Sequence, residues 1–423
     1  MLDCGVKVEK GDEEFPLLER RDLRGLNEVV ISHAHLDHVG YVPWLFSQGY
    51  RGKITLTKPT RDLSQVLLAD YLQIAKERGD RIPFSTKDLE NYLKHTELME
   101  YNSWNRGGTG NLRLQEAGHI LGSAITELKL PKGETLVYTG DIYLRETRLL
   151  QPAERHYHAQ YLIIESTYGA KTDRHPSLKE TGQAFVKSVN ETLDKGGNVV
   201  VPTFATGRGQ EILFTLESYM RSGALRKVPI FTDGMVNKML HIYRHNAVYL
   251  KREIQHRILT SEEDPFKSPH FHVPEQKDRS DVFEAAPCII LTTSGMLKGG
   301  PVMRYLEKLG PDPRNKLILV GYQAEGTPGR AILEGEREVE LRGGKKVYLR
   351  MSVEQAPFTA HADHYELVEF AKGIEGLRKV FIVHGEGHKG EELAEAIEHA
   401  TRRQGKPQVT CEAPAIGEEF QLR

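Results

Sequence analysis

Residues 28–38 read EVVISHAHLDH, an apolar run followed by four potential metal ligands. The largely β-branched segment at residues 29–32 predicts a short buried strand. The ligands that follow it are His33, His35, Asp37 and His38. In a turn that leaves a strand, neighbouring side chains can diverge toward two metal positions, which a regular helix could not arrange at this spacing. The stretch therefore predicts a metal site at a strand end.

Further apolar segments along the chain also end in polar residues that suit this chemistry. Residues 135–139, 161–164 and 380–383 are predicted strands, and they lead into Asp141, Glu165 and His384. His119 lies in the segment AGHILGS, where flanking glycines allow close approach of the backbone. Imidazoles form the nitrogen-rich side of hydrolytic zinc sites, and a carboxylate can bridge to a second zinc. Because ligands gather outside the carboxyl ends of strands, we expect these side chains to join the histidine cluster.

The order of predicted elements indicates a layered α/β architecture. With 423 residues, the chain is long enough for two or three compact units. Apolar runs that end in a polar cluster and then open a helix-like segment recur throughout. The central part has its own alternation, with strands predicted at 198–202, 228–231, 288–291 and 316–320 and a helix at 209–220. We therefore expect residues 1–170 and 352–423 to form one domain, interrupted by a second α/β domain at residues 171–351.

Composition narrows the class of protein. The formal net charge of −2 gives no global attraction to a polyanion, so a positive field for nucleic acid would have to be local. No apolar run is long enough to span a bilayer, and residues 1–10 lack the features of a secretory signal, which predicts a cytoplasmic protein. Cys4, Cys288 and Cys411 are odd in number and far apart, and we interpret them as ordinary thiols. The polar, proline-containing residues 251–280 are predicted to be a surface excursion.

The metal-ligand motifs resemble those of a known family. The ligands from His33 to His38, followed by His119, Asp141 and His384, look like the metallo-β-lactamase fold. Glu165, the segment FTAHAD at residues 358–363 and His384 resemble the additional motifs of the β-CASP nucleases, and residues 171–351 match that family's cap. Residues 202–208 (PTFATGR) and 293–296 (TSGM) are similar too. The resemblance is to the branch with the endonuclease subunit of the eukaryotic pre-mRNA 3′-end machinery and its archaeal relatives. It implies an αββα sandwich with an inserted α/β domain.

The resemblance also implies a role for each site residue. One zinc ion would be held by His33, His35 and His119, and a second by Asp37, His38 and His384, with Asp141 bridging the two. Asp3, in the motif Leu-Asp-Cys-Gly, would orient the ligand loop. His361 would be a general acid, hydrogen-bonded to Glu165. The sequence departs from the family at the amino terminus, because relatives usually have a glycine-containing strand pair before this motif, which here starts at Leu2.

The site predicts hydrolysis of a phosphodiester. Two zinc ions can activate a shared water and neutralise the phosphoryl oxygens. We expect single-stranded RNA as the substrate, cut internally, from the 5′ end, or both, by a homodimer or within an RNA-processing complex. Candidate RNA contacts on the inserted domain are Ser294, Gly295, Arg208 and Lys298. The glycine-rich residues 321–329 lack the Lys-Ser/Thr of a nucleotide-binding P-loop.

Three alternatives remain open from the sequence. A small-molecule hydrolase of the same fold is disfavoured by the long insertion together with Glu165 and His361. DNA processing is disfavoured by His384, because DNA-cutting relatives usually have an apolar residue at that position. A catalytically inactive scaffold would have lost ligands, and all of them are present in this sequence.

Overall fold

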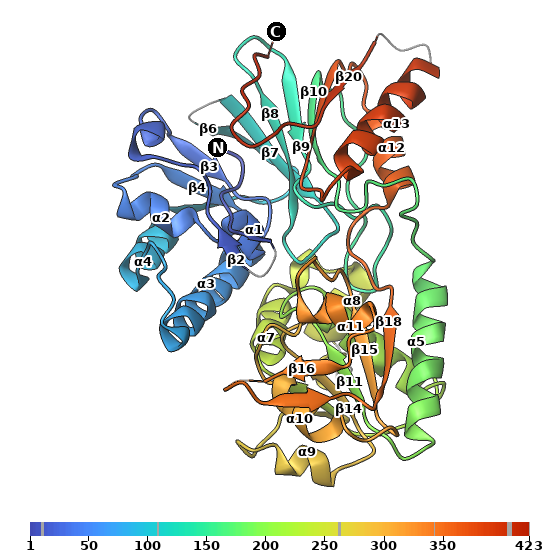
Figure 1. The fold of residues 1–423 in the computed structure, drawn as a ribbon. Coiled ribbons are helices and arrows are strands. Elements are labelled where there is room, and N and C mark those ends of the chain that lie inside the picture. The colour runs from blue at the N-terminus through green and yellow to red at the C-terminus, as the bar shows by residue number, and fades with distance from the viewer. Residues whose placement is uncertain (10–11, 108–109, 261–263, 342, 404–407, 423) are drawn as a thin grey trace.

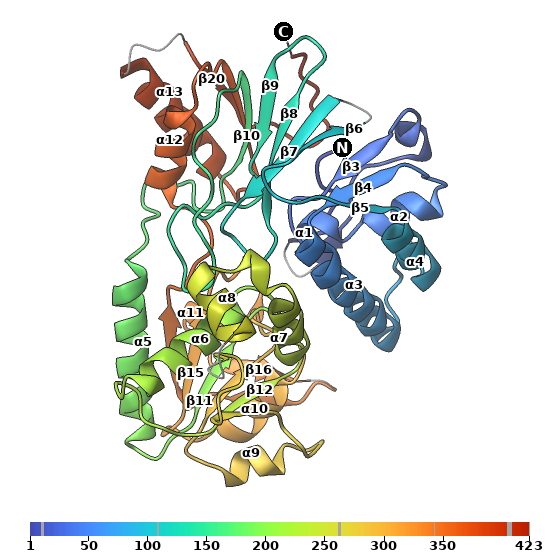
Figure 2. The same cartoon turned by 180° about the vertical axis from the view of Figure 1, so that it is seen from behind.

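The computed structural model describes residues 1–9, 12–107, 110–260, 264–341, 343–403 and 408–422, and its chain forms two lobes (Figures 1 and 2). The upper lobe in Figure 1 is a sandwich of two sheets with helices on its outer faces. The lower lobe is the inserted domain. The chain enters it after β10 (Tyr161–Glu165) and returns after β18 (Ser352–Ala356), so the upper lobe is built from both ends of the sequence.

The larger sheet of the sandwich carries strands from both sides of the insertion. Its order is β20-β19-β10-β9-β8-β7-β6. Its other strands are β6 (Trp104–Gly107), β7 (Gly110–Glu116), β8 (Ala124–Lys129), β9 (Thr135–Tyr138), β19 (Lys379–Val383) and β20 (Thr410–Glu412). β10 pairs in parallel with β9 on one side and β19 on the other, so their carboxyl ends meet at one edge. The helices α12 (His364–Gly373) and α13 (Lys389–Arg403) cover this sheet through a shared apolar cluster.

The smaller sheet consists of parallel strands that lead toward the same edge. It has the order β3-β4-β5, with β3 (Glu28–Val30), β4 (Lys53–Leu56) and β5 (Thr96–Leu98). The elements packed around it are the 3-10 helix η1 (Arg20–Leu23), α1 (Leu36–Val39), α2 (Val42–Ser47), α3 (Lys58–Arg78) and α4 (Thr86–Lys94). The long helix α3 is well delimited, because Thr57 accepts a hydrogen bond from the Thr60 backbone and Gly79 ends the helix at a φ of 77°. A hairpin of β1 (Lys7–Glu9) and β2 (Asp12–Glu14) precedes η1.

The inserted domain contains a parallel sheet of the order β13-β12-β14-β11-β15-β18. Its other strands are β11 (Val199–Pro202), β12 (Ile230–Asp233), β13 (Phe271–His272), β14 (Ile289–Thr292) and β15 (Lys316–Val320). The surrounding helices are α5 (Leu178–Leu193), α6 (Arg208–Arg221), α7 (Val236–His245), η2 (Ala247–Tyr249), α8 (Arg252–Leu259), α9 (Ser280–Glu284), α10 (Val302–Leu309) and α11 (Pro328–Leu333). A hairpin of β16 (Glu338–Glu340) and β17 (Lys346–Tyr348) completes it.

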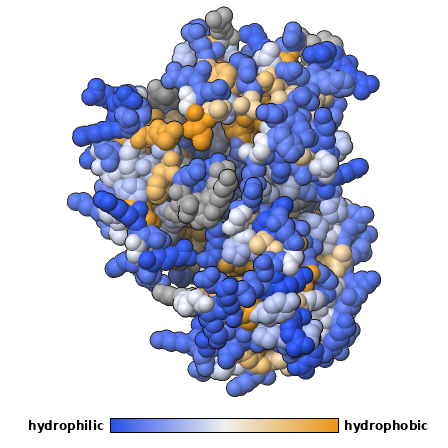
Figure 3. Space-filling model, viewed as in Figure 1, coloured by the Kyte–Doolittle hydropathy of each residue, from blue (hydrophilic) through white to orange (hydrophobic). Residues whose placement is uncertain are grey.

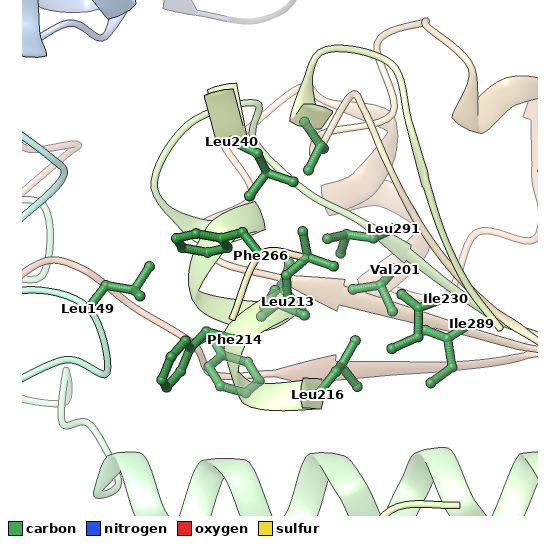
Figure 4. Packing of buried hydrophobic residues seen from close by; sticks show 14 of the residues in the cluster. Leu149, Val201, Leu213, Phe214, Leu216, Ile230, Leu240, Phe266, Ile289 and Leu291 are labelled. Atoms are coloured by element: carbon green, nitrogen blue, oxygen red, sulfur yellow. The ribbon is translucent and has the colours of Figure 1, made fainter. Parts of the chain in front are cut away.

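The core of the inserted domain is continuous with the sandwich. Figure 4 shows Leu213, Phe214 and Leu216 of α6 against strand residues such as Val201 and Ile289. The same cluster includes Leu149, Ile120 and Leu121 from the sandwich, all of them buried. Because burying a side chain of this size contributes about 1.5–3 kcal/mol, these contacts hold the two lobes together. Figure 3 shows one face of the molecule. Its surface is mostly hydrophilic, and apolar side chains form a band across its upper half.

The predicted fold class, an α/β sandwich with an inserted α/β domain, is confirmed. The predicted strands are present, with ends shifted by one or two residues. Most described residues of 251–280 are at least partly exposed, as predicted for a surface excursion, but the segment also forms α8 and the edge strand β13 and buries Ile254 and Phe266 in the core. The polar composition of the segment gave no indication that these two apolar side chains are buried. The sheet of the inserted domain also extends to Ala356, five residues beyond the boundary expected at 351, because β18 pairs with β15.

Among the residues that the structure describes, no helix is both long and apolar enough to cross a membrane.

Candidate metal centre

The ligand loop follows β3 and is held by a neighbouring backbone segment. The Cys4 N–H donates to the His38 carbonyl at 2.7 Å, and the Val6 N–H donates to the Leu36 carbonyl at 2.9 Å. Gly5 lies between them, so close that a Cβ atom there would be 1.7 Å from the Asp37 carbonyl oxygen. Only glycine fits this approach. The amino-terminal motif thus fixes the backbone of α1 and the directions of the side chains on it.

One group of side chains gathers nitrogen atoms around a single point. His35 Nδ1 lies 3.1 Å from His33 Nε2 and 3.1 Å from His119 Nε2. Asp141 Oδ2 lies 3.5 Å from His33 Nε2 and 3.6 Å from His119 Nε2. Ligands at bond lengths of ~2.0–2.1 Å in a tetrahedron are separated by about 3.3 Å, so these four atoms have the spacing of a tetrahedral zinc site.

A second group shares Asp141 with the first. His38 Nε2 lies 3.4 Å from Asp141 Oδ1 and 3.3 Å from His384 Nε2. Asp37 Oδ2 is 3.2 Å from His384 Nε2 and 4.0 Å from His38 Nε2. The two carboxylate oxygens of Asp141 therefore face different groups, which is the arrangement of a bridging ligand. All seven residues predicted as ligands meet at this point, which is where β3, β9, β10 and β19 end.

An unsatisfied polar atom supports the fit of a cation. Asp141 Oδ1 is buried and has no hydrogen-bond partner within the described parts of the chain. A buried carboxylate oxygen without a donor is costly, and a cation would compensate it. Burial lowers the pKa of His35 to about 4, although Asp37 opposes this, so the imidazole is in its neutral, metal-binding form. The cluster therefore fits a metal ion by geometry and by charge.

Hydrogen bonds on the far nitrogens select the imidazole tautomers. His119 Nδ1 donates to the Ala360 carbonyl at 2.8 Å, which leaves Nε2 without a proton and facing the cluster. His384 Nδ1 lies 3.1 Å from the Thr167 hydroxyl. His38 Nδ1 lies 2.6 Å from Asp3 Oδ2, so its Nε2 is also free to bind a metal. Such partners orient metal ligands and raise their basicity.

Asp3 connects four groups around the ligand loop. Its Oδ2 atom accepts from His38 Nδ1, the Ser32 hydroxyl and the Tyr138 hydroxyl, each at 2.6 Å. Its Oδ1 atom accepts from the Ser32 N–H at 2.7 Å. Ser32 in turn contacts His33 Nδ1 at 3.1 Å. Asp3 thus contacts His38 directly and His33 through one hydroxyl.

Glu165 and His361 form a pair beside the cluster. His361 Nδ1 lies 3.0 and 2.9 Å from the two carboxylate oxygens of Glu165. The carboxylate is fully buried and also accepts the Ile142 N–H at 2.8 Å. His361 Nε2 lies 4.0 Å from Asp141 Oδ2, so it points toward the reaction centre. Burial alone would lower the pKa of His361, but Glu165 and Asp141 together raise it.

Several contacts at the site were not predicted from the sequence. Tyr138 and Thr167 hold Asp3 and His384, respectively, and the Ala360 carbonyl holds His119. Tyr168 packs its ring against His361, with 6.1 Å between the ring centroids. Tyr138 and Thr167 each lie within three residues of a predicted ligand or acid, at a strand end, and that position is the signal that could have identified them.

The predicted RNA contacts lie on the inserted domain. Ser294 and Gly295 follow β14, and Gly295 packs so tightly on the loop after β11 that a Cβ atom would be 3.0 Å from Phe204 N. The Ser294 hydroxyl donates to the Gly299 carbonyl at 3.1 Å. Arg208 is buried rather than solvated. Its Nη1 donates to the Thr359 carbonyl at 2.8 Å, close to His361, while its Nη2 has no partner in the described residues.

Lys298 is the predicted RNA contact with the least connection to the metal cluster. Its carbonyl accepts from Arg78 Nη2 of α3 at 3.0 Å, which is a contact between the lobes.

Three family models match successive parts of the sequence. Residues 1–189 match the anti-Pycsar protein Apyc1, residues 209–332 match the Beta-Casp domain, and residues 346–411 match the Zn-dependent metallo-hydrolase RNA specificity domain. A crystal structure of a protein of unknown function from Enterococcus faecalis has a similar fold. It has a TM-score of 0.54 and 15% identity, and the match covers 93% of this chain and 81% of that one.

Relatives from archaea match almost the whole chain. The transcription termination factor FttA of Methanocaldococcus jannaschii is 38% identical over 96% of this chain and 66% of its own length. The factors of the same name from Methanothermobacter thermautotrophicus and Cenarchaeum symbiosum are each 37% identical, with 98% and 100% of this chain and 68% and 67% of their own lengths covered. The chain spans about two thirds of the length of these curated relatives.

Proposed function

The chain belongs to the β-CASP family of metallo-hydrolases, and we propose that it is a zinc-dependent ribonuclease that hydrolyses phosphodiester bonds of single-stranded RNA. The family resemblance inferred from the sequence is thereby confirmed. The observation that carries the proposal is the position of Asp141, whose two oxygens face two groups of donor atoms, beside the pair of His361 and Glu165. A small-molecule hydrolase would not need the second lobe that faces this site.

The donor set favours two zinc ions per chain. The first group offers three imidazole nitrogens and the second offers two, the first group has tetrahedral spacing, and no cysteine takes part among the described residues. His33, His35 and His119 would hold one ion, and Asp37, His38 and His384 the other, with Asp141 between them. When bound, such a pair of ions activates a water molecule for in-line attack and neutralises charge on the phosphoryl oxygens.

Residues of the chain would protonate the leaving 3′-oxygen. His361 holds a proton on Nε2, because Glu165 accepts from Nδ1 and favours the imidazolium form. That proton would pass to the 3′-oxygen of the leaving nucleotide, which is a poor leaving group without it. Glu165 is itself fixed by the Ile142 N–H, so the imidazole has a defined direction. The products would carry a 5′-phosphate and a 3′-hydroxyl.

The inserted domain would supply the second wall for the RNA strand. The loops after β11 and β14 lie together where the order of the parallel sheet reverses, the usual ligand position in such sheets. Arg208 adds a buried guanidinium nitrogen that lacks an acceptor in the described residues, which a phosphate oxygen could provide. We propose Arg208, Ser294 and Gly295 as phosphate contacts, and Lys298 as a more distant one.

The name of the archaeal relatives suggests the origin of the substrate. They are transcription termination factors, and a ribonuclease with this role would cut newly made RNA in the cytoplasm. Termination itself, assembly into a complex and a homodimer remain predictions, since the chain covers about two thirds of those proteins.

A cleavage assay on end-labelled oligonucleotides tests the proposal. Purified protein with added zinc should cut 5′- and 3′-labelled single-stranded RNA, and the Asp141→Ala variant should not. Asp194→Ala, at an exposed helix end, is the matched control and should retain activity. Faster cutting of DNA of the same sequence would favour the alternative of a DNA nuclease. Absence of cleavage of either polymer would contradict the proposal.

A further inference from the structure

A hollow lies at the end of the smaller sheet that is remote from the metal cluster. It has a volume of about 730 Å³ and lies between η1, the residues before β3 and the loop from α2 to β4. Asn27 and Gly52 line it, and they immediately precede the parallel strands β3 and β4. The ligand loop starts beyond the opposite end of β3. The segment from Asn27 to His33 spans at most ~20 Å. The hollow is therefore a separate feature on the same lobe.

Arginine dominates the lining of this hollow. The residues that line it are Arg20, Arg21, Leu23, Arg24, Leu26, Asn27, Gln48, Gly49, Tyr50, Arg51 and Gly52. None of these is acidic, although the whole chain has a formal net charge of −2. The positive charge is thus concentrated locally. A nucleic-acid surface on this chain needs such a local field, because the net charge gives no global attraction to a polyanion.

Three of these four arginines form no ion pair among the side chains that the structure describes. Arg21 Nε contacts Glu19 at 3.0 Å and Asp22 at 3.9 Å. Arg20, Arg24 and Arg51 are exposed, and none of them forms an ion pair with an acidic side chain that the structure describes. Arg51 donates through Nη1 to the Tyr50 carbonyl at 2.7 Å, which holds its guanidinium at the rim. Each free guanidinium presents donors in a planar fork that matches phosphate oxygens.

We propose that this hollow, the arginine groove, binds the phosphate backbone of single-stranded RNA as a second contact site outside the active site. A protein partner fits the groove less well, because protein interfaces have an apolar or aromatic centre. Here Tyr50 is buried, and Leu23 and Leu26 are only partly exposed. Amide groups of Asn27 and Gln48 add neutral hydrogen-bond partners that do not select a base sequence.

The inference rests on the proposed function, which supplies RNA as the ligand. It predicts how binding affinity depends on the length of the RNA. An RNA that reaches from the active site along the lobe to the groove should bind more tightly than one that fills the active site alone. The groove shares no residue with the metal ligands or with His361. Its contribution can therefore be removed without altering the reaction centre.

Salt-dependent binding of RNA tests the groove. The triple variant Arg20→Gln/Arg24→Gln/Arg51→Gln is compared with the parent by fluorescence anisotropy on 30-nucleotide and 6-nucleotide RNA. All proteins also carry Asp141→Asn, so that no substrate is cut. With ~0.7 counterions released per phosphate contact on single strands, the slope of log affinity against log salt should fall by about 2. Affinity for the long RNA should fall on the order of ten-fold or more at 0.15 M salt, and that for the short RNA should not change.

A control variant distinguishes the effect of the groove arginines from the effect of a lower net charge on RNA binding. Lys195→Gln/Lys227→Gln/Lys308→Gln removes the same charge from exposed positions on the inserted domain and should bind both RNAs like the parent. Equal slopes and affinities for the parent and the groove variant would overturn the inference while leaving the proposed function intact. If the groove variant binds RNA more weakly but the chain without Asp141→Asn cuts no RNA in the cleavage assay, the groove is supported and the ribonuclease is contradicted. No RNA binding by the parent would overturn both.

Discussion

Replacing Asp3 by Asn should weaken the second group of ligands while the fold persists. The substitution keeps the shape of the side chain but removes its charge and turns one oxygen into a donor. Oδ2 accepts three hydrogen bonds at 2.6 Å, and Oδ1 accepts one at 2.7 Å, so at least one donor loses its acceptor whichever way the amide turns. His38 loses a charged partner, and His33 is affected only through Ser32.

The size of the effect follows from the bonds lost. A hydrogen bond to a charged group contributes about 1.5–3 kcal/mol, and one to a neutral group about 1 kcal/mol. The difference of roughly 0.5–2 kcal/mol at His38 corresponds to about 2–30-fold in zinc affinity, which overlaps the 10–100-fold range typical of such outer partners. We expect the weaker of the two zinc-binding steps to lose on the order of ten-fold and the stronger step to change less.

Zinc titration against a competing chelator, with metal analysis after dialysis, measures this effect. Asp194→Asn, an exposed helix end, should titrate like the parent. If Asp3→Asn does not fold, Tyr138→Phe removes a single donor to the same carboxylate and should give a smaller shift in the same direction. Parental zinc affinities for Asp3→Asn, in a protein with a normal circular dichroism spectrum, would refute the orienting role of Asp3.

Four further outcomes are expected. Metal analysis should find about two zinc ions per chain, and at most one tightly held ion with no gain of activity on adding zinc would contradict the shared site. Mass spectrometry of products should find 5′-phosphate and 3′-hydroxyl ends, even with a 2′-deoxy substitution at the cut site, whereas a 2′,3′-cyclic phosphate would exclude attack by water. His361→Ala should retain zinc and RNA affinity but lose roughly 10²–10⁴ in rate, and a parental rate would disprove the general acid. Gly5→Ala should lose zinc and thermal stability, because its Cβ would lie 1.7 Å from the Asp37 carbonyl oxygen, whereas Gly373→Ala, with open space around it, should have little effect.

The ligand cluster could be predicted because its residues lie in short sequence segments that follow predicted strands. His33, His35, Asp37 and His38 lie within one turn, and Asp141 and His384 follow apolar strands that the sequence identifies. The pairing of Glu165 with His361 was expected only from the family resemblance. These two residues are 196 positions apart, and no local pattern connects them.

Other features depend on packing that no local pattern reports. The Ala360 carbonyl holds His119 across 241 positions, and a backbone atom leaves no signature in composition. Arg208 was predicted as an RNA contact, but the sequence did not indicate that this first residue of α6 is buried. The segment at residues 251–280 contains enough polar residues to resemble a loop, yet two apolar side chains are sufficient to anchor it.

The parallel pairing of β10 with β19 has a consequence for synthesis of the chain. Glu165 lies opposite Val383 in this pair, so strands from before and after the inserted domain complete one edge. During translation, His361 and His384 are made after the six other ligands and after the inserted domain. A nascent chain that has not yet released these residues from the ribosome lacks one zinc ligand and the acid. If the chain is the ribonuclease proposed above, its activity begins only when the last strands of the sandwich have folded.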